Sequence, residues 1–167
     1  MNEAYAEWLV KRKTQFVSYV LVGLMGVVTV ICVLLALTGI GGIISMILMF
    51  LAGGATYLLH RNTNIEFEYL YIGGQLSIDK IMGRAKRKKV WEGSVDDVQI
   101  IAPSDSYVLK DYARQGARKV DVSSGIPGVK TYTIMVQAGA NSSEIVFEPN
   151  DKMLHCIRQT APRKVVL

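Results

Sequence analysis

A run of basic side chains is the strongest chemical signal in this sequence. Five of the six residues at positions 84–89 carry a positive charge: Arg84, Lys86, Arg87, Lys88 and Lys89. Near an anionic membrane, each such residue contributes roughly 1 kcal/mol of attraction, which salt weakens. We therefore predict that these residues contact anionic phospholipid headgroups. A solvated hairpin or a signal for membrane topology would account for the same pattern.

Other residue types associated with catalysis are not spaced for it. Ser77 and Lys80 match an S-x-x-K nucleophile motif, and segments 104–106 and 130–132 imperfectly match its two partner motifs. That chemistry needs the serine at the start of a helix, whereas residues 75–82 alternate as a strand does. We predict no catalytic residue, no cofactor and a non-enzymatic function.

Metal and nucleic-acid sites are not predicted either. His155 and Cys156 are adjacent in a helical segment, where neighbouring side chains diverge by about 100° and do not chelate as a pair. The basic run occurs without a nucleic-acid-binding motif. We therefore expect neither a metal ion nor a nucleic acid as a partner.

A charge-free stretch precedes the basic run. Residues 14–60 contain no Asp, Glu, Lys or Arg. Within it, 16–37 and about 42–60 suit helices that cross a bilayer, which takes about 20 residues, and the glycine-rich turn between them favours a reversal. We predict a transmembrane helical hairpin. A signal peptide is disfavoured, because its apolar region spans only about 7–15 residues.

Charges flanking the hairpin predict its orientation. Lys11, Arg12 and Lys13 precede the first helix and Arg61 follows the second, while the turn between the helices is uncharged. The positive-inside rule then places both termini in the cytoplasm and the protein in the cell membrane.

The residues before the hairpin resemble an interfacial anchor. Tyr5 and Trp8 share one face of a short predicted helix, where their rings suit headgroup depth, next to Lys11, Arg12 and Lys13. A terminus that simply continues the first helix is the alternative.

Small residues are frequent in both predicted helices. Gly23, Gly26, Gly53 and Gly54 allow close helix approach, mainly within the hairpin. Self-association or binding of a protein partner through these glycine-rich helices is a second interpretation.

The chain after the hairpin has the pattern of a small β domain. Residues 65–72 alternate apolar and polar side chains, Gly73-Gly74 suits a hairpin turn, and 75–82 return. Further strands and a closing helix at about 150–161 complete the pattern, whereas 104–128 is compatible with helix, strand or loop. We predict an α+β fold with two domains: residues 1–61 hold the transmembrane hairpin, and residues 62–167 form a mainly antiparallel β barrel or sandwich closed by the C-terminal helix.

Strand lengths predict where the basic run lies. The eight residues 65–72 lead about 26 Å away from the membrane end at Arg61, at ~3.3 Å per residue. The return strand is equally long, so the basic run is expected to begin near the lipid surface.

Several motifs together resemble a known family. The segment IEFEYLYIGGQLSIDKIMGRAKRKK directly after the hairpin, FEPN at 147–150 and PRKV at 162–165 resemble the uncharacterised small two-span membrane proteins of Gram-positive bacteria that are grouped as a domain of unknown function. Strands closed by a C-terminal helix resemble, more distantly, bacterial pleckstrin-homology-like (PH-like) domains. Neither resemblance implies a known activity.

The combined interpretation is an integral membrane protein that presents a PH-like interaction domain at the inner leaflet. The expected partners are the lipid bilayer and its anionic headgroups, contacted through the basic run 84–89. The alternative is an accessory or scaffold subunit of a larger membrane protein complex.

Overall fold

Two compact units make up the chain. The computed structural model describes residues 5–83, 86–114, 116–138 and 141–166. One unit, the β unit, comprises Met1–Lys13, Glu66–Ile81 and Arg87–Leu167, and the other, the hairpin unit, comprises Thr14–Ile65 and Met82–Lys86.

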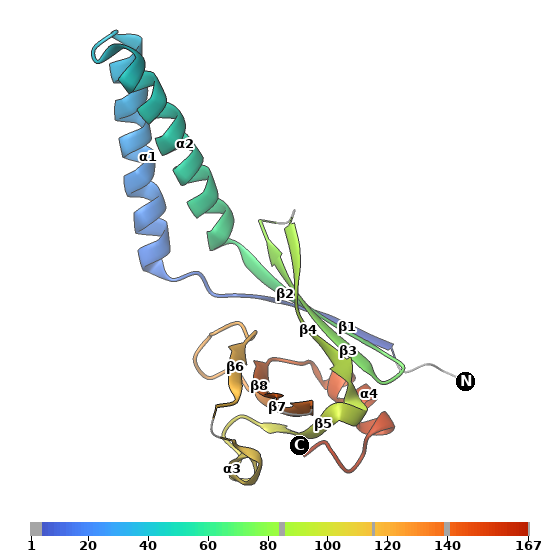
Figure 1. Cartoon of the computed structure of the whole chain (residues 1–167). Helices are drawn as coiled ribbons and strands as arrows, with labels where there is room; N and C mark the ends of the chain where they lie inside the picture. The colour runs from blue at the N-terminus through green and yellow to red at the C-terminus, as the bar shows by residue number, and fades with distance from the viewer. Residues whose placement is uncertain (1–4, 84–85, 115, 139–140, 167) are drawn as a thin grey trace. The chain divides into compact units, whose positions relative to one another are not determined.

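Two long apolar helices dominate the hairpin unit (Figure 1). α1 (Phe16–Leu37) and α2 (Gly42–Thr63) each have 22 residues, so each is about 33 Å long and matches a hydrocarbon core of about 30 Å. α1 buries no residue and α2 buries only Ser45. A helix of a soluble core would bury an apolar stripe. Both helices are long and apolar enough to cross a membrane.

A short turn and one polar contact hold the two helices as a hairpin. The Thr38 backbone N–H donates to the Leu34 carbonyl at 3.0 Å, and Gly41 takes a φ of 88°, which favours glycine. Midway along the helices, the hydroxyls of Thr29 and Thr56 hydrogen-bond to each other at 2.9 Å. Each hydroxyl also lies 2.9 Å from the carbonyl four residues earlier, Met25 for Thr29 and Ala52 for Thr56, so these polar groups find their partners within the hairpin rather than in lipid.

The glycines of the helices do not all serve packing within the hairpin. A Cβ added at Gly53 would lie 3.9 Å from Thr29, but one added at Gly23, Gly26 or Gly54 would have no neighbour within 4 Å. The intrahairpin role predicted for these last three glycines is therefore wrong, since an added Cβ would reach no atom of the other helix.

The residues ahead of the hairpin form a strand, so the predicted short helix is wrong. β1 (Tyr5–Lys11) pairs antiparallel with β2 (Ile65–Ile72), from Tyr5 opposite Ile72 to Lys11 opposite Glu66. Ala6 and Val10 are buried, and the pairing satisfies backbone groups along β2 that would otherwise form an open sheet edge.

This pairing also changes the domain division. The expected boundary separates residues 1–61 from 62–167, whereas the β unit includes the chain up to Lys13. The two helices are thus an insertion between two neighbouring strands. Within the hairpin unit, the Thr14 hydroxyl donates to the Thr63 carbonyl at 2.7 Å, which holds the two ends of the insertion together.

Sheet A of the β unit has the order β1-β2-β3-β4. β3 (Gln75–Met82) follows β2 through Gly73 and Gly74, whose φ angles of 52° and 94° favour glycine and suit a tight hairpin turn. β4 (Lys86–Ser94) is the edge strand opposite β1. The inward side chains of β2 and β3 are buried: Phe67, Tyr69, Tyr71, Leu76 and Ile78.

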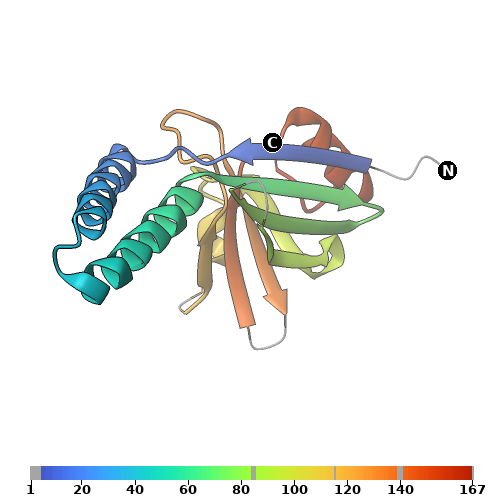
Figure 2. The same cartoon turned by 90° about the horizontal axis from the view of Figure 1, so that it is seen from above.

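Sheet B is mixed and has the order β5-β7-β8-β6. Its strands are β5 (Val98–Pro103), β6 (Arg118–Asp121), β7 (Tyr132–Ala138) and β8 (Asn141–Phe147). β6 pairs parallel to β8, whereas the other pairings are antiparallel. The 3-10 turn Val95–Asp97 joins the two sheets. The strands of sheet A run across β7 and β8 (Figure 2), and Tyr69 meets Phe147 edge-to-face at 5.8 Å in the core.

The segment 104–128, left open by the sequence, contains all three kinds of structure. A single helical turn, α3 (Leu109–Tyr112), is followed by β6 and then by a loop that leads into β7. This loop contains Ser123 and Ser124 of the network described below.

The closing helix has the predicted position. α4 (Asp151–Thr160) begins where the Asn150 side chain accepts a hydrogen bond from the Met153 N–H at 2.8 Å. It buries Met153, Leu154 and Ile157. The α+β fold with a helix closing the sheets is therefore confirmed.

Candidate functional site

The edge strand β4 begins with four basic residues. Lys86, Arg87, Lys88 and Lys89 are all exposed, while Arg84 of the predicted headgroup site lies outside the described residues. Because side chains alternate along a strand, Lys86 and Lys88 share one face, and Arg87 and Lys89 share the other.

Arg87 and Lys89 already have carboxylate partners. Arg87 forms a two-pronged ion pair with Glu68, at 3.2 Å for the longer contact, and the Glu68 side chain is only 14% exposed. Lys89 pairs with Glu92, and this hydrogen bond raises the pKa of the Lys89 ammonium group. Among the described residues, Lys86 and Lys88 form no salt bridge. Of the described basic run, these two therefore carry the charge left for an external anion.

The turn before β4 lies against the end of α2 within the hairpin unit. The Gly83 N–H donates to the Asn64 carbonyl at 2.9 Å. A Cβ at Gly83 would come within 2.6 Å of the Arg61 side chain, and the φ of 58° also favours glycine there. This contact agrees with the strand-length argument, because the chain returns to the helix end directly before the basic run.

The predicted interfacial anchor does not form one cluster. Tyr5 and Trp8 are 47% and 40% exposed on β1, but Tyr5 lies about 20 Å along the strand from Lys11. The Tyr5 hydroxyl donates to Glu7 at 2.6 Å. Lys11 lies opposite Glu66. Membrane contact by these residues stays a prediction.

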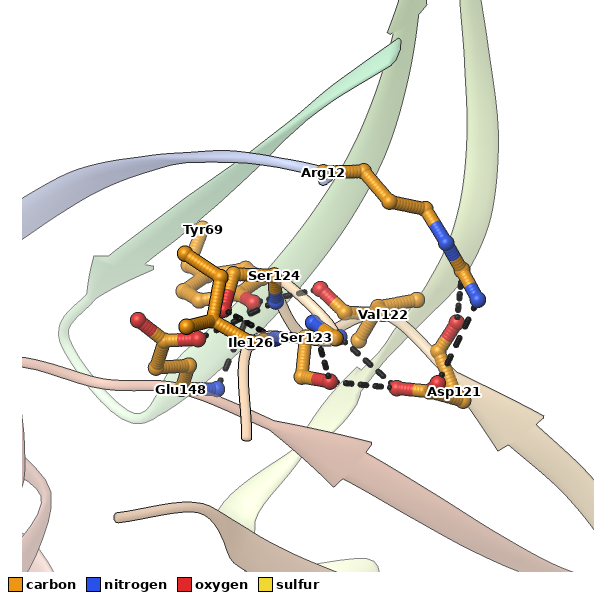
Figure 3. A network of polar contacts seen from close by, with 9 residues as sticks. Arg12, Tyr69, Asp121, Val122, Ser123, Ser124, Ile126 and Glu148 are labelled. Atoms are coloured by element: carbon orange, nitrogen blue, oxygen red, sulfur yellow. Dashed lines mark hydrogen bonds and ion pairs between the residues drawn. The ribbon is translucent and has the colours of Figure 1, made fainter. Parts of the chain in front are cut away.

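Arg12 instead belongs to a polar network that the sequence did not reveal (Figure 3). Its guanidinium donates to the Asp121 carbonyl at 3.0 Å and pairs with the Asp121 carboxylate at 3.3 Å. The other carboxylate oxygen of Asp121 accepts from the Ser123 N–H at 3.0 Å and from the Ser123 hydroxyl at 2.7 Å.

Ser124 is the centre of this network, which we call the linker network. Its N–H donates to the Glu148 carboxylate at 3.0 Å, and its carbonyl accepts from the Lys13 N–H at 2.7 Å. Its hydroxyl accepts from the Ile126 N–H at 3.2 Å. Members of the linker network are Arg12, Lys13, Tyr69, Asp121, Ser123, Ser124 and Glu148.

Tyr69 supports the network from the core. Its hydroxyl donates to the Val122 carbonyl at 2.6 Å and accepts from the Glu148 N–H at 3.3 Å. Burial raises the pKa of the Tyr69 phenol, so the group stays a neutral donor. The only local signal for this network is the short polar spacing of Asp121 and Ser123, which is typical of a turn.

The three segments that imitate a serine-nucleophile site are not assembled as one. A hollow of about 510 Å³ is lined by Ser104, Asp105, Lys130 and Thr131, with Gly128 and Val129. Two of the three segments thus meet, but Ser77 stands on β3 and is not part of the lining. No group of three potential metal ligands occurs among the described residues.

The fold defines a class of protein: two β-sheets closed by a C-terminal helix, with an apolar helical hairpin inserted between the first two strands. A family model described as "Bacterial PH-like domain (DUF6106)" matches residues 2–167. The chain therefore belongs to this family, which has no assigned function, as the sequence resemblance predicted. No curated protein and no solved structure matches the chain.

Proposed function

We propose that this protein crosses the cell membrane twice and holds its PH-like domain at the cytoplasmic surface, where Lys86 and Lys88 contact anionic phospholipid headgroups. In this role the domain is a non-enzymatic interaction module. The two exposed apolar helices support the membrane anchor. Lys11–Lys13 and Arg61 flank the hairpin and support the cytoplasmic orientation.

One observation carries the lipid contact: the bond between Gly83 and Asn64 at the end of α2. Asn64 directly follows the last residue of a candidate membrane span. Lys86 lies three residues after Gly83, and Lys88 follows two residues later on the same strand face. Along the chain, Lys86 and Lys88 are therefore only three and five residues from the contact at the end of the membrane span. Headgroup phosphates lie at the depth where such a span ends.

A competing explanation follows from the place of β4 in the sheet. Lysines are frequent on edge strands, where they prevent pairing with other sheets. This explanation needs no lipid, whereas headgroup contact requires that the lysines select anionic lipids.

The test is lipid selectivity of the full chain reconstituted in phosphatidylcholine bilayers. Electron paramagnetic resonance compares how much spin-labelled phosphatidylglycerol and phosphatidylcholine the protein immobilises. We expect about a twofold preference for phosphatidylglycerol that high salt removes, because exposed lysines act electrostatically. The Lys86→Gln/Lys88→Gln variant should lose the preference.

A matched pair of exposed basic residues provides the control. The Lys110→Gln/Arg114→Gln variant removes the same charge from α3 and the residues after it. It should keep the preference. Equal immobilisation of both lipids by the unaltered protein would contradict headgroup contact and favour the edge-strand explanation.

A second candidate function is that of an accessory subunit in a membrane complex. It is favoured by the open faces at Gly23, Gly26 and Gly54, where an added Cβ would meet nothing in this chain. Small residues on such faces allow a further helix to approach closely. Purification in mild detergent should then yield a complex that Gly26→Leu disrupts, and a monodisperse monomer without companions would count against it.

A further inference from the structure

The loop between β6 and β7 exposes an apolar tip. Ile126 and Val129 are 46% and 38% exposed, and Pro127 between them is also exposed. Gly125 precedes the tip and Gly128 lies within it, with φ angles of 68° and 83°. Single exposed apolar residues are ordinary, but three within four positions of one turn form a small apolar projection.

The linker network joins the base of this loop to the chain that enters α1. Ser124 accepts a hydrogen bond from Lys13, and Lys13 lies three residues before Phe16, where α1 begins. Three residues reach at most about 11 Å. Chain length alone therefore keeps the base of the loop close to the first turn of the membrane helix.

The network also gives the loop base a defined structure. Ser124 is bonded through its N–H to Glu148 and through its carbonyl to Lys13. Arg12 binds Asp121, where β6 ends and the loop begins. The start of the loop is thus bonded to Arg12 and Lys13, which precede α1. It is also bonded to Glu148, which follows β8.

At the tip, the backbone of Ile126 is hydrogen-bonded within the loop. The Ile126 N–H donates to the Ser124 hydroxyl at 3.2 Å, and the Ile126 carbonyl accepts from the Val129 N–H at 3.4 Å. Both polar backbone groups of Ile126 therefore have partners within the loop. Transfer of an unpaired backbone group from water into an apolar phase would be costly.

Basic residues flank the tip on both sides. Lys130 follows Val129 and is exposed, and Lys13 is exposed beside Ser124. Beside Lys13, the acidic groups Asp121 and Glu148 are already hydrogen-bonded within the network. Lys130 lies over the Tyr132 ring at 5.2 Å and has Asp105 and Asp151 as its acidic neighbours. Apolar side chains with lysines at their margin fit the interface of a phospholipid bilayer, where the tip enters the acyl boundary and the ammonium groups meet phosphates.

We propose that the 125–130 loop inserts Ile126, Pro127 and Val129 into the bilayer interface and so forms a second membrane attachment of the β unit. This inference rests on the membrane anchor of the proposed function but is independent of the lysines on β4. It assigns the linker network a role: it keeps the loop beside the membrane entry of α1.

The test is the depth of a fluorophore on the loop in the full chain. In a Cys32→Ala/Cys156→Ser background, Ile126→Cys carries an environment-sensitive label, and the protein is reconstituted in phosphatidylcholine liposomes. A Tyr107→Cys label is the matched control, because Tyr107 is 73% exposed on another turn. Among the described residues, no hydrogen bond joins that turn to residues 12–15.

We expect about threefold weaker quenching by aqueous iodide at position 126 than at 107, because interface residues are screened from bulk water. Quenching by spin-labelled lipid should show the opposite order. A Val129→Cys label repeats the measurement in case the Ile126→Cys variant folds poorly. Equal iodide quenching at 126, 129 and 107 would overturn the inference.

The experiment separates this inference from the headgroup proposal. Loop insertion should persist in high salt and in the Lys86→Gln/Lys88→Gln variant, since it depends on apolar contact. A water-exposed loop together with retained phosphatidylglycerol preference would refute the inference alone. An inserted loop without lipid preference would support the inference and refute headgroup contact.

Discussion

At the scale of single residues, two buried tyrosines on β2 differ in what their hydroxyls contact. The Tyr69 hydroxyl bonds to Val122 and Glu148. For the Tyr71 hydroxyl, no partner meets hydrogen-bond geometry among the described residues. Both side chains are fully buried. Removing the hydroxyl from each in turn therefore separates the contribution of the linker network to stability from that of aromatic packing.

Tyr69→Phe should destabilise the β unit by about 1–3 kcal/mol, because the Val122 carbonyl and the Glu148 N–H lose a buried partner. Tyr71→Phe should change the free energy of unfolding by much less. Denaturant unfolding of the full chain in detergent, followed by near-ultraviolet circular dichroism, measures both. Equal losses would show that the network adds nothing to stability.

The basic residues of the run also differ from one another in their contacts. Five charges within six positions look equivalent in the sequence. Yet Arg87 and Lys89 are paired with carboxylates, whereas Lys86 and Lys88 are not among the described ion pairs. The partner Glu68 is 19 residues away from Arg87 and lies on another strand. A local charge pattern contains no information about such a pairing.

At the scale of elements, β1 decides how the β unit can be produced without its membrane anchor. β1 pairs with β2 along its whole length, and the hairpin separates the two strands in the chain. A fragment of residues 62–167 lacks β1, so it leaves the β2 edge open and uncovers part of the core.

We predict that replacing residues 14–64 with a short Asn-Gly turn gives a soluble, monomeric β unit, because two antiparallel neighbours accept a tight connection. The fragment 62–167 should aggregate or melt at a markedly lower temperature. Light scattering coupled to gel filtration, together with thermal melts, compares the two proteins. Similar behaviour would mean that β1 is dispensable for the fold.

At the scale of the whole molecule, the insertion predicts that both connections of the hairpin lie on one side of the membrane. In the cysteine-free background, Ile40→Cys marks the exposed turn between α1 and α2, and Tyr107→Cys marks the β unit. In intact cells, a membrane-impermeant maleimide should label only position 40. Position 107 should react after permeabilisation. The reverse pattern would contradict the positive-inside orientation.

Much of the architecture follows from local periodicity. The charge-free stretch predicted both long helices, the alternation of 65–72 and the Gly73-Gly74 pair predicted the first hairpin of strands, and the pattern at about 150–161 predicted α4. These patterns are reliable because burial and turn geometry select residue types over a few neighbouring positions.

Pairing across long separations was decided only by the tertiary structure. The sequence by itself determined the hairpin, the principal strands and the closing helix. It did not determine that residues 5–11 complete sheet A, since a seven-residue segment becomes a strand only when β2 offers its edge. Nor did it determine the contact of Arg12 with Asp121, 109 residues apart. Hydrogen bonds and ion pairs of this kind depend on which backbones the folded chain brings together, and local residue preference does not encode them.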